Sequence, residues 1–179
     1  MNNIEIEKLI KISYEIRKDV INMLAKAGSG HLGGSLGMAD IFTVLYFNEL
    51  KHDPLQPYWE LRDRVIVSNG HIAPVWYATL SNAGYFSKKE LFSLRQFGSR
   101  LQGHPSRLSG LPGIESSSGS LGQGLSVAVG MALAAKFFQS NYRVFCLMGD
   151  GELQEGNVWE AFMSAGHYKL ANLLAIVDR

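Results

Sequence analysis

Three histidines stand in settings that suit chemistry at a ligand. His31, His71 and His104 each directly follow a glycine in a segment predicted to be a loop, so no neighbouring side chain keeps a ligand from the ring. Imidazole donates hydrogen bonds to phosphate or carbonyl oxygens and exchanges protons near neutral pH. Taken singly, each is better explained as a loop histidine with a structural hydrogen bond. His52 and His167 lack this setting, and we interpret them as surface or helix residues.

The three loop histidines have a competing use as a zinc triad. Their spacing, however, matches neither the helical nor the hairpin patterns that zinc ligands usually follow. The sequence therefore gives the zinc interpretation little support.

A second candidate follows a predicted buried strand at residues 144–148. Residues 149–156 read Gly-Asp-Gly-Glu-Leu-Gln-Glu-Gly. Because ligands of open α/β sheets bind beyond the carboxyl ends of the strands, Asp150 lies at the expected functional edge. A carboxylate is a hard oxygen ligand for Mg²⁺, and the flanking glycines let a diphosphate approach the backbone. The tripeptide alone is equally well explained as a polar turn, but the helix and buried strand predicted after it make a diphosphate site the more specific interpretation.

Composition excludes several other classes of protein. The 17 Lys and Arg residues nearly balance the 16 Asp and Glu residues, so no basic excess points to nucleic acid or to an anionic membrane. Hydrophobic residues make up 46% of the chain, a content too high for an intrinsically disordered protein. No apolar signal core or membrane-spanning run of about 20 residues is seen. With a single cysteine, Cys146, the chain fits a reducing compartment, and we expect a soluble cytoplasmic protein.

The elements that must position the candidate residues are predicted from the apolar pattern. Apolar residues three or four apart predict a helix from Leu9 to Ala27, which Gly28 ends. Ser87 and Glu90 predict a capping box at the start of another helix. Helices are expected over 74–82, 87–96, 125–138 and 158–169, an apolar segment over 39–50, strands over 64–68, 144–148 and 173–177, and a long glycine- and serine-rich loop over 98–124.

Strand, helix and strand in this order imply parallel strands joined by right-handed crossovers. We therefore expect an α/β fold, with a doubly wound, mostly parallel sheet and helices on both faces. No linker or repeat divides the chain, so residues 1–179 are expected to form one domain or part of one.

Several of these segments, in the same order, resemble the N-terminal, diphosphate-binding part of the transketolase family. They are residues 26–31, 36–40, 63–71, 102–105 and 113–124, and the motif that begins at Gly149. The resemblance extends from about Leu9 to Arg179, with Leu32 and Ser120 standing where many members have Pro. It implies a three-layer, thiamin diphosphate-binding fold. The related deoxyxylulose-phosphate synthases and branched 2-oxo acid dehydrogenases are less similar, because neither is expected to have the whole set of segments.

The resemblance implies a cofactor site. Asp150 matches the family's metal-binding aspartate, and His71 matches a residue that lies against thiamin diphosphate. The other matches are glycines beside the diphosphate and loop residues at the aminopyrimidine and thiazolium rings: Gly149, Gly151, Gly119, Ser120 and Leu121.

The resemblance also implies contacts with substrate and with a second protomer. His31 and His104 match residues that contact the donor and acceptor sugars near the reactive carbon. Glu155 matches an acid near the dimer interface that links the two cofactor sites, and Glu160 is a candidate to join it. Without the motif around them, Glu155 would be interpreted as a solvated loop acid and Glu160 as an ordinary acid of a first helical turn.

One part of the family's metal site falls outside the sequence. The family's second metal ligand, an asparagine, is expected at position 180, directly after Arg179. Mg²⁺ holds weakly to a single carboxylate. We therefore expect a domain that is incomplete at its C-terminal end. Binding of thiamin diphosphate and Mg²⁺ (or Ca²⁺ or Mn²⁺) by this chain alone is expected to be weak.

The activity that the resemblance implies is transfer of a two-carbon ketol unit between sugar phosphates. It would require a partner chain with the pyrimidine-binding domain, in a homodimer or a heterotetramer. The alternatives are a non-catalytic assembly or regulatory subunit that has lost cofactor binding, and a truncated reading frame. The strand ending at Val177 is expected to expose apolar surface and a sheet edge, and so to promote association.

Overall fold

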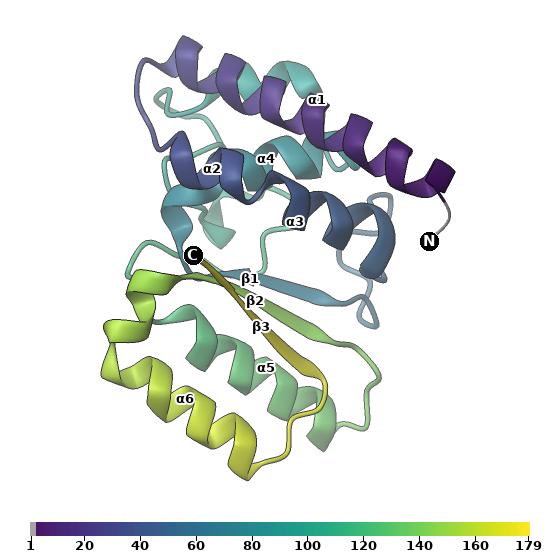
Figure 1. Ribbon diagram of the computed structural model, residues 1–179, viewed down its shortest axis with the longest axis vertical. Helices are drawn as coiled ribbons and strands as arrows, with labels where there is room; N and C mark the ends of the chain where they lie inside the picture. The colour runs from purple at the N-terminus through teal and green to yellow at the C-terminus, as the bar shows by residue number, and fades with distance from the viewer. Residues whose placement is uncertain (1–2) are drawn as a thin grey trace.

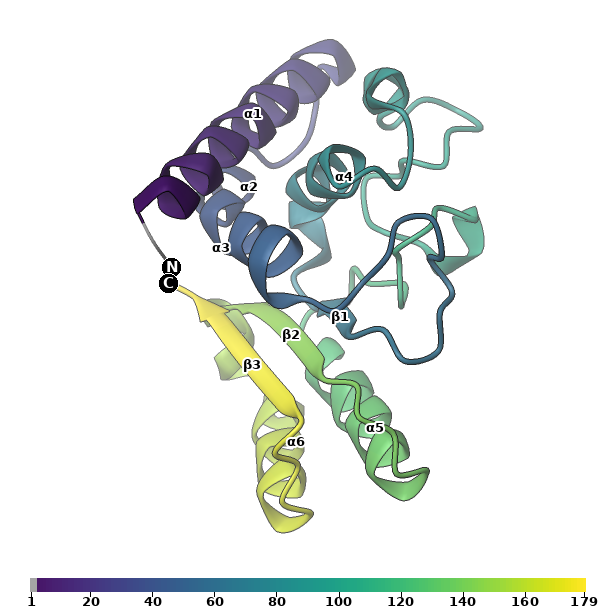
Figure 2. The same cartoon turned by 90° about the vertical axis from the view of Figure 1, so that its right-hand side faces the viewer.

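The computed structural model describes residues 3–179 and has a parallel three-stranded sheet at its centre. The strands are β1 (Arg64–Val67), β2 (Val144–Gly149) and β3 (Leu173–Asp178), in the spatial order β1-β2-β3. Both pairs are parallel, and Val144 is aligned with Arg64 on one side and with Leu173 on the other. Figure 1 and Figure 2 show helices on both faces of the sheet, which confirms the three-layer α/β prediction.

The N-terminal layer covers one face of the sheet. Its helices are α1 (Asn3–Ala27), α2 (Gly33–Gly37), α3 (Ala39–Val44) and α4 (Ala73–Asn82), and a π-helical turn (Leu45–Glu49) follows α3. The predicted apolar stripe of α1 is confirmed, because Ile16, Val20 and Met23 are fully buried in the core shared with α3 and α4.

The other face of the sheet carries α5 (Gly124–Phe137) and α6 (Gly156–His167). Alternate side chains of β2 enter different cores: Cys146 packs with α5 and α6, whereas Phe145 and Leu147 pack with the N-terminal layer. The strand is apolar at successive positions because both of its faces are buried.

The predicted capped helix at 87–96 is a 3-10 helix (Lys88–Ser93) instead. Ser87 accepts a hydrogen bond from a backbone amide of the first turn, as an N-cap residue does. Glu90 does not complete the box, because its carboxylate accepts hydrogen bonds of 2.8 and 2.9 Å from Arg100. A bidentate, charge-assisted pair outcompetes a bond to a backbone amide. The capping-box prediction was therefore wrong.

The long loop before α5 is irregular as predicted, apart from a 3-10 turn (Arg107–Ser109). Its later part is anchored to the segment before β1, since the Glu115 carboxylate accepts hydrogen bonds of 2.8 and 2.7 Å from Arg62 and both residues are buried. Among the described residues, no helix is long and apolar enough to cross a membrane.

Candidate functional site

The carboxyl ends of β1 and β2 lie side by side, because the two strands are parallel neighbours. A 3-10 turn follows each strand closely, Gly70–Ile72 after β1 and Asp150–Gln154 after β2. The turns carry His71 and Asp150, so the sheet edge brings two of the predicted motifs together. This is the edge at which open α/β sheets bind their ligands.

The three loop histidines converge on this edge. The rings of His31 and His71 meet edge to face, with their centroids 5.2 Å apart. Partial burial lowers the pKa of His71 below its ordinary value of 6.5, the charges of His31 and His104 lower it further, and the Glu152 carboxylate opposes the shift. His71 is half-buried, whereas His31 and His104 are exposed. Within residues 3–179, no three His, Cys, Asp or Glu side chains are grouped to hold a metal, so the zinc triad gains no support.

The serine-glycine loop packs directly on the His71 turn. A Cβ atom on Gly70 would lie 2.6 Å from Ser118 Oγ, and no side chain fits in that space. The same loop reaches the third histidine, since a Cβ on Gly119 would lie 3.5 Å from the His104 ring. Gly119 therefore lies beside both the His71 turn and His104, and its contact with the cofactor stays a prediction.

Asp150 has an available carboxylate. The side chain is exposed and makes no hydrogen bond or ion pair to any described residue. Two buried oxygens on the neighbouring loops, Asn69 Oδ1 and Ser118 Oγ, also lack a partner there. Buried polar atoms are nearly always hydrogen-bonded in a complete site. Asn69 lies beside Gly149, where a Cβ would be 4.0 Å from the Asn69 amide nitrogen, so its unpaired oxygen and the free Asp150 carboxylate fit a hydrated Mg²⁺ whose other ligands a diphosphate would supply.

Glu152 is a residue of this site that the sequence did not single out. It is only 2% exposed, and its Oε1 atom accepts hydrogen bonds from Ser68 Oγ at 2.5 Å and from the Gly122 amide at 2.7 Å. Its Oε2 atom accepts one from the Gly149 amide at 2.8 Å. The carboxylate thus joins the end of β1, the serine-glycine loop and the Gly-Asp-Gly motif.

Arg95 is a second residue near the candidate site that the sequence did not single out. Its backbone has a positive φ of 60°, and its guanidinium lies close enough to Gly103 that a Cβ there would be 2.7 Å from Arg95 Nε. The side chain makes no hydrogen bond or ion pair among the described residues. A cation without a partner therefore lies next to the residue that precedes His104. Nothing in the local pattern of the sequence distinguishes Arg95 from other surface arginines.

The remaining predicted site residues lie around the serine-glycine loop and on α6. Glu155 is exposed and packs against Gly122, where φ is +78° and a Cβ would lie 3.0 Å from Glu155 Cβ. Ser120 and Leu121 are exposed on the loop, and Glu160 is exposed on α6. Their roles remain predictions, as do those of Gly149 and Gly151.

His52 differs from its interpretation as a surface or helix residue. It is half-buried in a loop, with Nδ1 2.9 Å from the Tyr85 hydroxyl and Nε2 2.7 Å from the Tyr46 carbonyl oxygen. Two side-chain hydrogen bonds and ring contacts with both tyrosines explain its burial. His167 is exposed at the end of α6, as expected.

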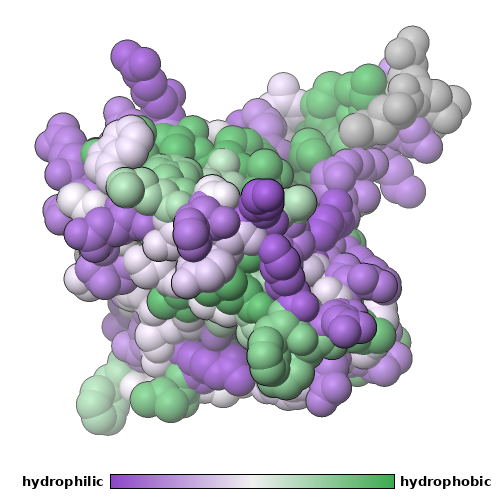
Figure 3. Space-filling model, turned by 90° about the horizontal axis from the view of Figure 1, so that it is seen from below, coloured by the Kyte–Doolittle hydropathy of each residue, from purple (hydrophilic) through white to green (hydrophobic). Residues whose placement is uncertain are grey.

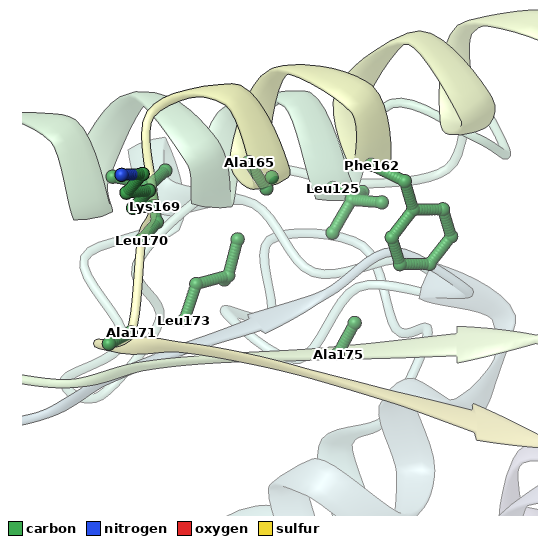
Figure 4. Close-up of a pocket in the computed structure, with 9 residues that line it drawn as sticks. Leu125, Phe162, Ala165, Lys169, Leu170, Ala171, Leu173 and Ala175 are labelled. Carbon is green, nitrogen blue, oxygen red and sulfur yellow. The ribbon is translucent and has the colours of Figure 1, made fainter.

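Two pockets lie near α5. One, of about 320 Å³, is lined by residues 116–120 of the serine-glycine loop and by the first turns of α5. The other, of about 540 Å³, opens between α6 and β3, where Figure 4 shows Leu173 and Ala175 pointing from the strand toward the helix that carries Ala165 and Phe162. The second pocket is mainly apolar and contains none of the candidate site residues. The candidate residues therefore lie at the sheet edge and not in this apolar pocket.

The fold and its site define the class as an α/β ligand-binding domain that works at the carboxyl edge of a parallel sheet. Residues 9–179 match the family described as "Transketolase, thiamine diphosphate binding domain". The chain belongs to the transketolase family.

Its relatives include components of divided enzymes as well as full-length ones. The chain is 43% identical, over 98% of its length, to one subunit of the apulose-4-phosphate transketolase from Phocaeicola vulgatus, and it covers 62% of that subunit. It is 42% identical, over 91% of its length, to a 6-deoxy-6-sulfo-D-fructose transketolase subunit from a Clostridium species, of which it covers 59%. The crystal structure of Campylobacter jejuni transketolase superposes with a TM-score of 0.91 at 38% identity, over 99% of this chain and 28% of that one. The chain thus spans about three-fifths of the subunits and little more than a quarter of the full-length enzyme.

Proposed function

We propose that this chain is the diphosphate-binding component of a transketolase-like enzyme that transfers a two-carbon ketol unit between sugars. The observation that supports this best is the gathering of an available Asp150 carboxylate, the His71 turn and the Ser118–Gly119 backbone at one sheet edge. The cofactor is thiamin diphosphate, which when bound supplies the carbon nucleophile and stores the resulting negative charge.

The metal and the diphosphate would be held by the β2 turn. Asp150 is the carboxylate ligand of Mg²⁺, or of Ca²⁺ or Mn²⁺, and Gly149 and Gly151 let the diphosphate approach the backbone. The exposed residues Ser120 and Leu121 would contact the rings of the cofactor together with Gly119.

The histidines would handle protons and orient the sugar. Because the pKa of His71 is lowered, its ring is neutral at pH 7 and offers one donor and one acceptor to the cofactor. His31 and His104 are exposed, and we assign them to hydrogen bonds with the hydroxyl and carbonyl oxygens of donor and acceptor sugars.

The substrates would be sugars with an anionic group. One of the two subunit relatives is named for a sugar phosphate and the other for a sulfo sugar. In this chain the unpartnered Arg95 lies beside the His104 turn, where its guanidinium is available to such a group.

We further propose that a partner chain with the pyrimidine-binding domain completes the enzyme in the cytoplasm, as a homodimer or a heterotetramer. The names of the two subunit relatives and the partial coverage of both support this division. Glu155 and Glu160, both exposed beside the serine-glycine loop or on α6, are assigned to the contact between protomers.

Calorimetry with thiamin diphosphate and Mg²⁺ tests the proposal, with and without the partner chain. We expect binding by the wild-type protein that Asp150→Asn abolishes. The matched control is Glu60→Gln, because Glu60 is an exposed acid whose carboxylate lies outside the site. Ketol transfer that persists in a protein carrying both Asp150→Ala and His104→Ala would refute the site assignment.

The second candidate function is a non-catalytic assembly or regulatory subunit. It is favoured because Asp150 is a single carboxylate, to which Mg²⁺ binds weakly. The same calorimetry separates the two functions, because the assembly subunit would bind no cofactor even when the partner is present.

A further inference from the structure

Glu152 is a buried acidic side chain at the sheet edge, and both of its carboxylate oxygens are hydrogen-bonded. It lies in the 3-10 turn after β2 and is 2% exposed. Its two oxygens accept three hydrogen bonds, from Ser68 Oγ, the Gly122 amide and the Gly149 amide. Ser68 Oγ in turn accepts a bond of 3.0 Å from the Gly124 amide at the start of α5.

All the donors to this carboxylate are neutral. Within the described chain Glu152 forms no salt bridge, and the groups that donate to it are a hydroxyl and two amides. Burying a carboxylate without a cation is costly, and the cost is offset here because the carboxylate accepts from a hydroxyl and two backbone amides that would otherwise be unpaired. The chemistry of the residue thus indicates a task other than filling the core.

The three donors occupy the points at which the site is assembled. Ser68 immediately precedes the Asn69–His71 turn, Gly122 ends the loop of Gly119–Leu121, and Gly149 immediately precedes Asp150. One side chain therefore fixes the relative positions of the histidine turn, the cofactor loop and the metal-binding carboxylate. A displacement of about 1 Å in such groups is enough to cost substantial binding or rate.

We infer that Glu152 is a positioning residue that holds these three segments in the arrangement required for the diphosphate and its metal. The inference rests on the proposed function for its ligand, but the three hydrogen bonds to the Glu152 carboxylate are a property of the free protein. This positioning role requires both oxygens of the Glu152 carboxylate to act as acceptors.

The Glu152→Gln variant tests that requirement with almost no change in volume. Whichever way the amide is turned, its NH₂ group must face either the Gly149 amide or the Gly122 amide, and donor then meets donor. One of the two backbone segments must move. We expect the dissociation constant for thiamin diphosphate at saturating Mg²⁺ to rise roughly tenfold or more, as for a buried donor left unpaired.

A matched control separates positioning from loss of stability. Val20→Ala removes buried apolar volume from α1, in the N-terminal layer, and should lower the thermal midpoint of the free protein at least as much as Glu152→Gln. We expect Val20→Ala to retain the wild-type dissociation constant. Equal losses of affinity in both variants would overturn the inference, as would wild-type affinity in Glu152→Gln.

Amide hydrogen exchange in the free protein gives a readout that needs no cofactor. In Glu152→Gln, the amide of Gly122 or of Gly149 should exchange faster than in wild type. In Val20→Ala, the exchange rates of these two amides relative to those of the β2 amides should be the same as in wild type. Unchanged protection of both glycines in Glu152→Gln would overturn the inference. If the wild-type protein fails to bind thiamin diphosphate even with the partner chain, the proposed function fails, and the exchange data still decide the role of Glu152.

Discussion

At the scale of single residues, the site depends on where charges are left without partners. Asp150 and Arg95 are ionic side chains with no partner among the described residues, whereas Glu115 and Asp63 are buried and paired with arginines. Paired charges hold the fold together, and unpaired ones at a sheet edge are available to a ligand. Glu60 is an exposed acid that is also unpaired within residues 3–179, so the missing partner is informative only together with the position at the sheet edge.

The protonation of His71 should respond to its neighbour. Burial is the largest cause of its lowered pKa, and the charge of His31 is the next. We therefore expect His31→Asn to raise the pKa of His71 toward 6.5 without reaching it, since burial persists. NMR titration of the His71 ring measures this, with the exposed His167→Asn as control. A further fall in the pKa of His71 would contradict the electrostatic contact.

The lowered pKa of His71 makes the free energy of unfolding depend on pH. Because the folded pKa of His71 lies below the unfolded value, the native state binds fewer protons near pH 6. The contribution of His71 is fully present above pH 6.5 and is lost as the pH falls through the folded pKa. His31→Asn should reduce this loss, which urea unfolding across that range would detect.

Arg95 should discriminate between charged and uncharged substrates. In the assembled enzyme, we expect Arg95→Gln to raise KM for an anionic sugar about tenfold or more, because a charge-assisted bond to the anion is lost. The kcat value should change much less. The KM for the same sugar without its anionic group should not change. Lys89→Gln, an exposed cation of the neighbouring 3-10 helix, is the control. An equal change for both sugars would show that Arg95 has only a structural role.

At the scale of elements, α1 is joined to α3 by an ion pair whose contribution to stability should decrease at acid pH. Arg17 donates hydrogen bonds of 2.8 and 2.9 Å to Asp40, and Ser13 donates another. The Arg17 bond, followed by that of Ser13, lowers the pKa of Asp40 from 3.8 to about 2. The stability that this pair contributes is present above about pH 4 and is lost as the pH falls toward about pH 2.

Arg17→Met should remove this acid-dependent part of the stability. The Asp40 side chain is 68% exposed, so solvent screening limits the effect to below about 1 kcal/mol. Urea unfolding at neutral and acid pH measures it, with Lys8→Met on the exposed face of α1 as control. The two variants should converge with wild type once Asp40 is protonated. A difference that persists at the acid end would mean that packing, not charge, is responsible.

The elements were predictable wherever apolar periodicity determines them. The three strands were found within one residue at each end, whereas the helix predicted from Leu9 begins earlier, at Asn3. Successive residues of β1 and β2 are buried, and those of β3 are only partly so. The capping box at Ser87 was wrong because Arg100, distant along the chain, takes the Glu90 carboxylate. The same reason hid Glu152, whose partners Ser68 and Gly122 lie 84 and 30 residues away. A motif indicates the residues that touch the ligand, and not those that hold the motif in place.

At the scale of the whole molecule, the sheet ends at a strand with one neighbour. β3 pairs with β2, and no other strand pairs with it among the described residues. Leu174 and Val177, on opposite faces of β3, are 51% and 37% exposed. Large apolar side chains are also exposed on α5 and α6 or at their ends, including Phe137, Phe138 and Met163. Figure 3, seen from that side, shows hydrophobic patches among the hydrophilic residues.

An apolar edge strand of this kind promotes association. We expect the protein to self-associate, or to bind its partner chain, at about tens of micromolar. Leu174→Lys should weaken the association, because a lysine on an edge strand must lose its hydration when another strand pairs there. Leu55→Lys is the control, since Leu55 is 88% exposed in a loop far from β3 in the sequence. Light scattering measures both. A monomeric wild-type protein at that concentration, with or without the partner, would mean that the edge of β3 is tolerated in solution and that the contact surface lies elsewhere.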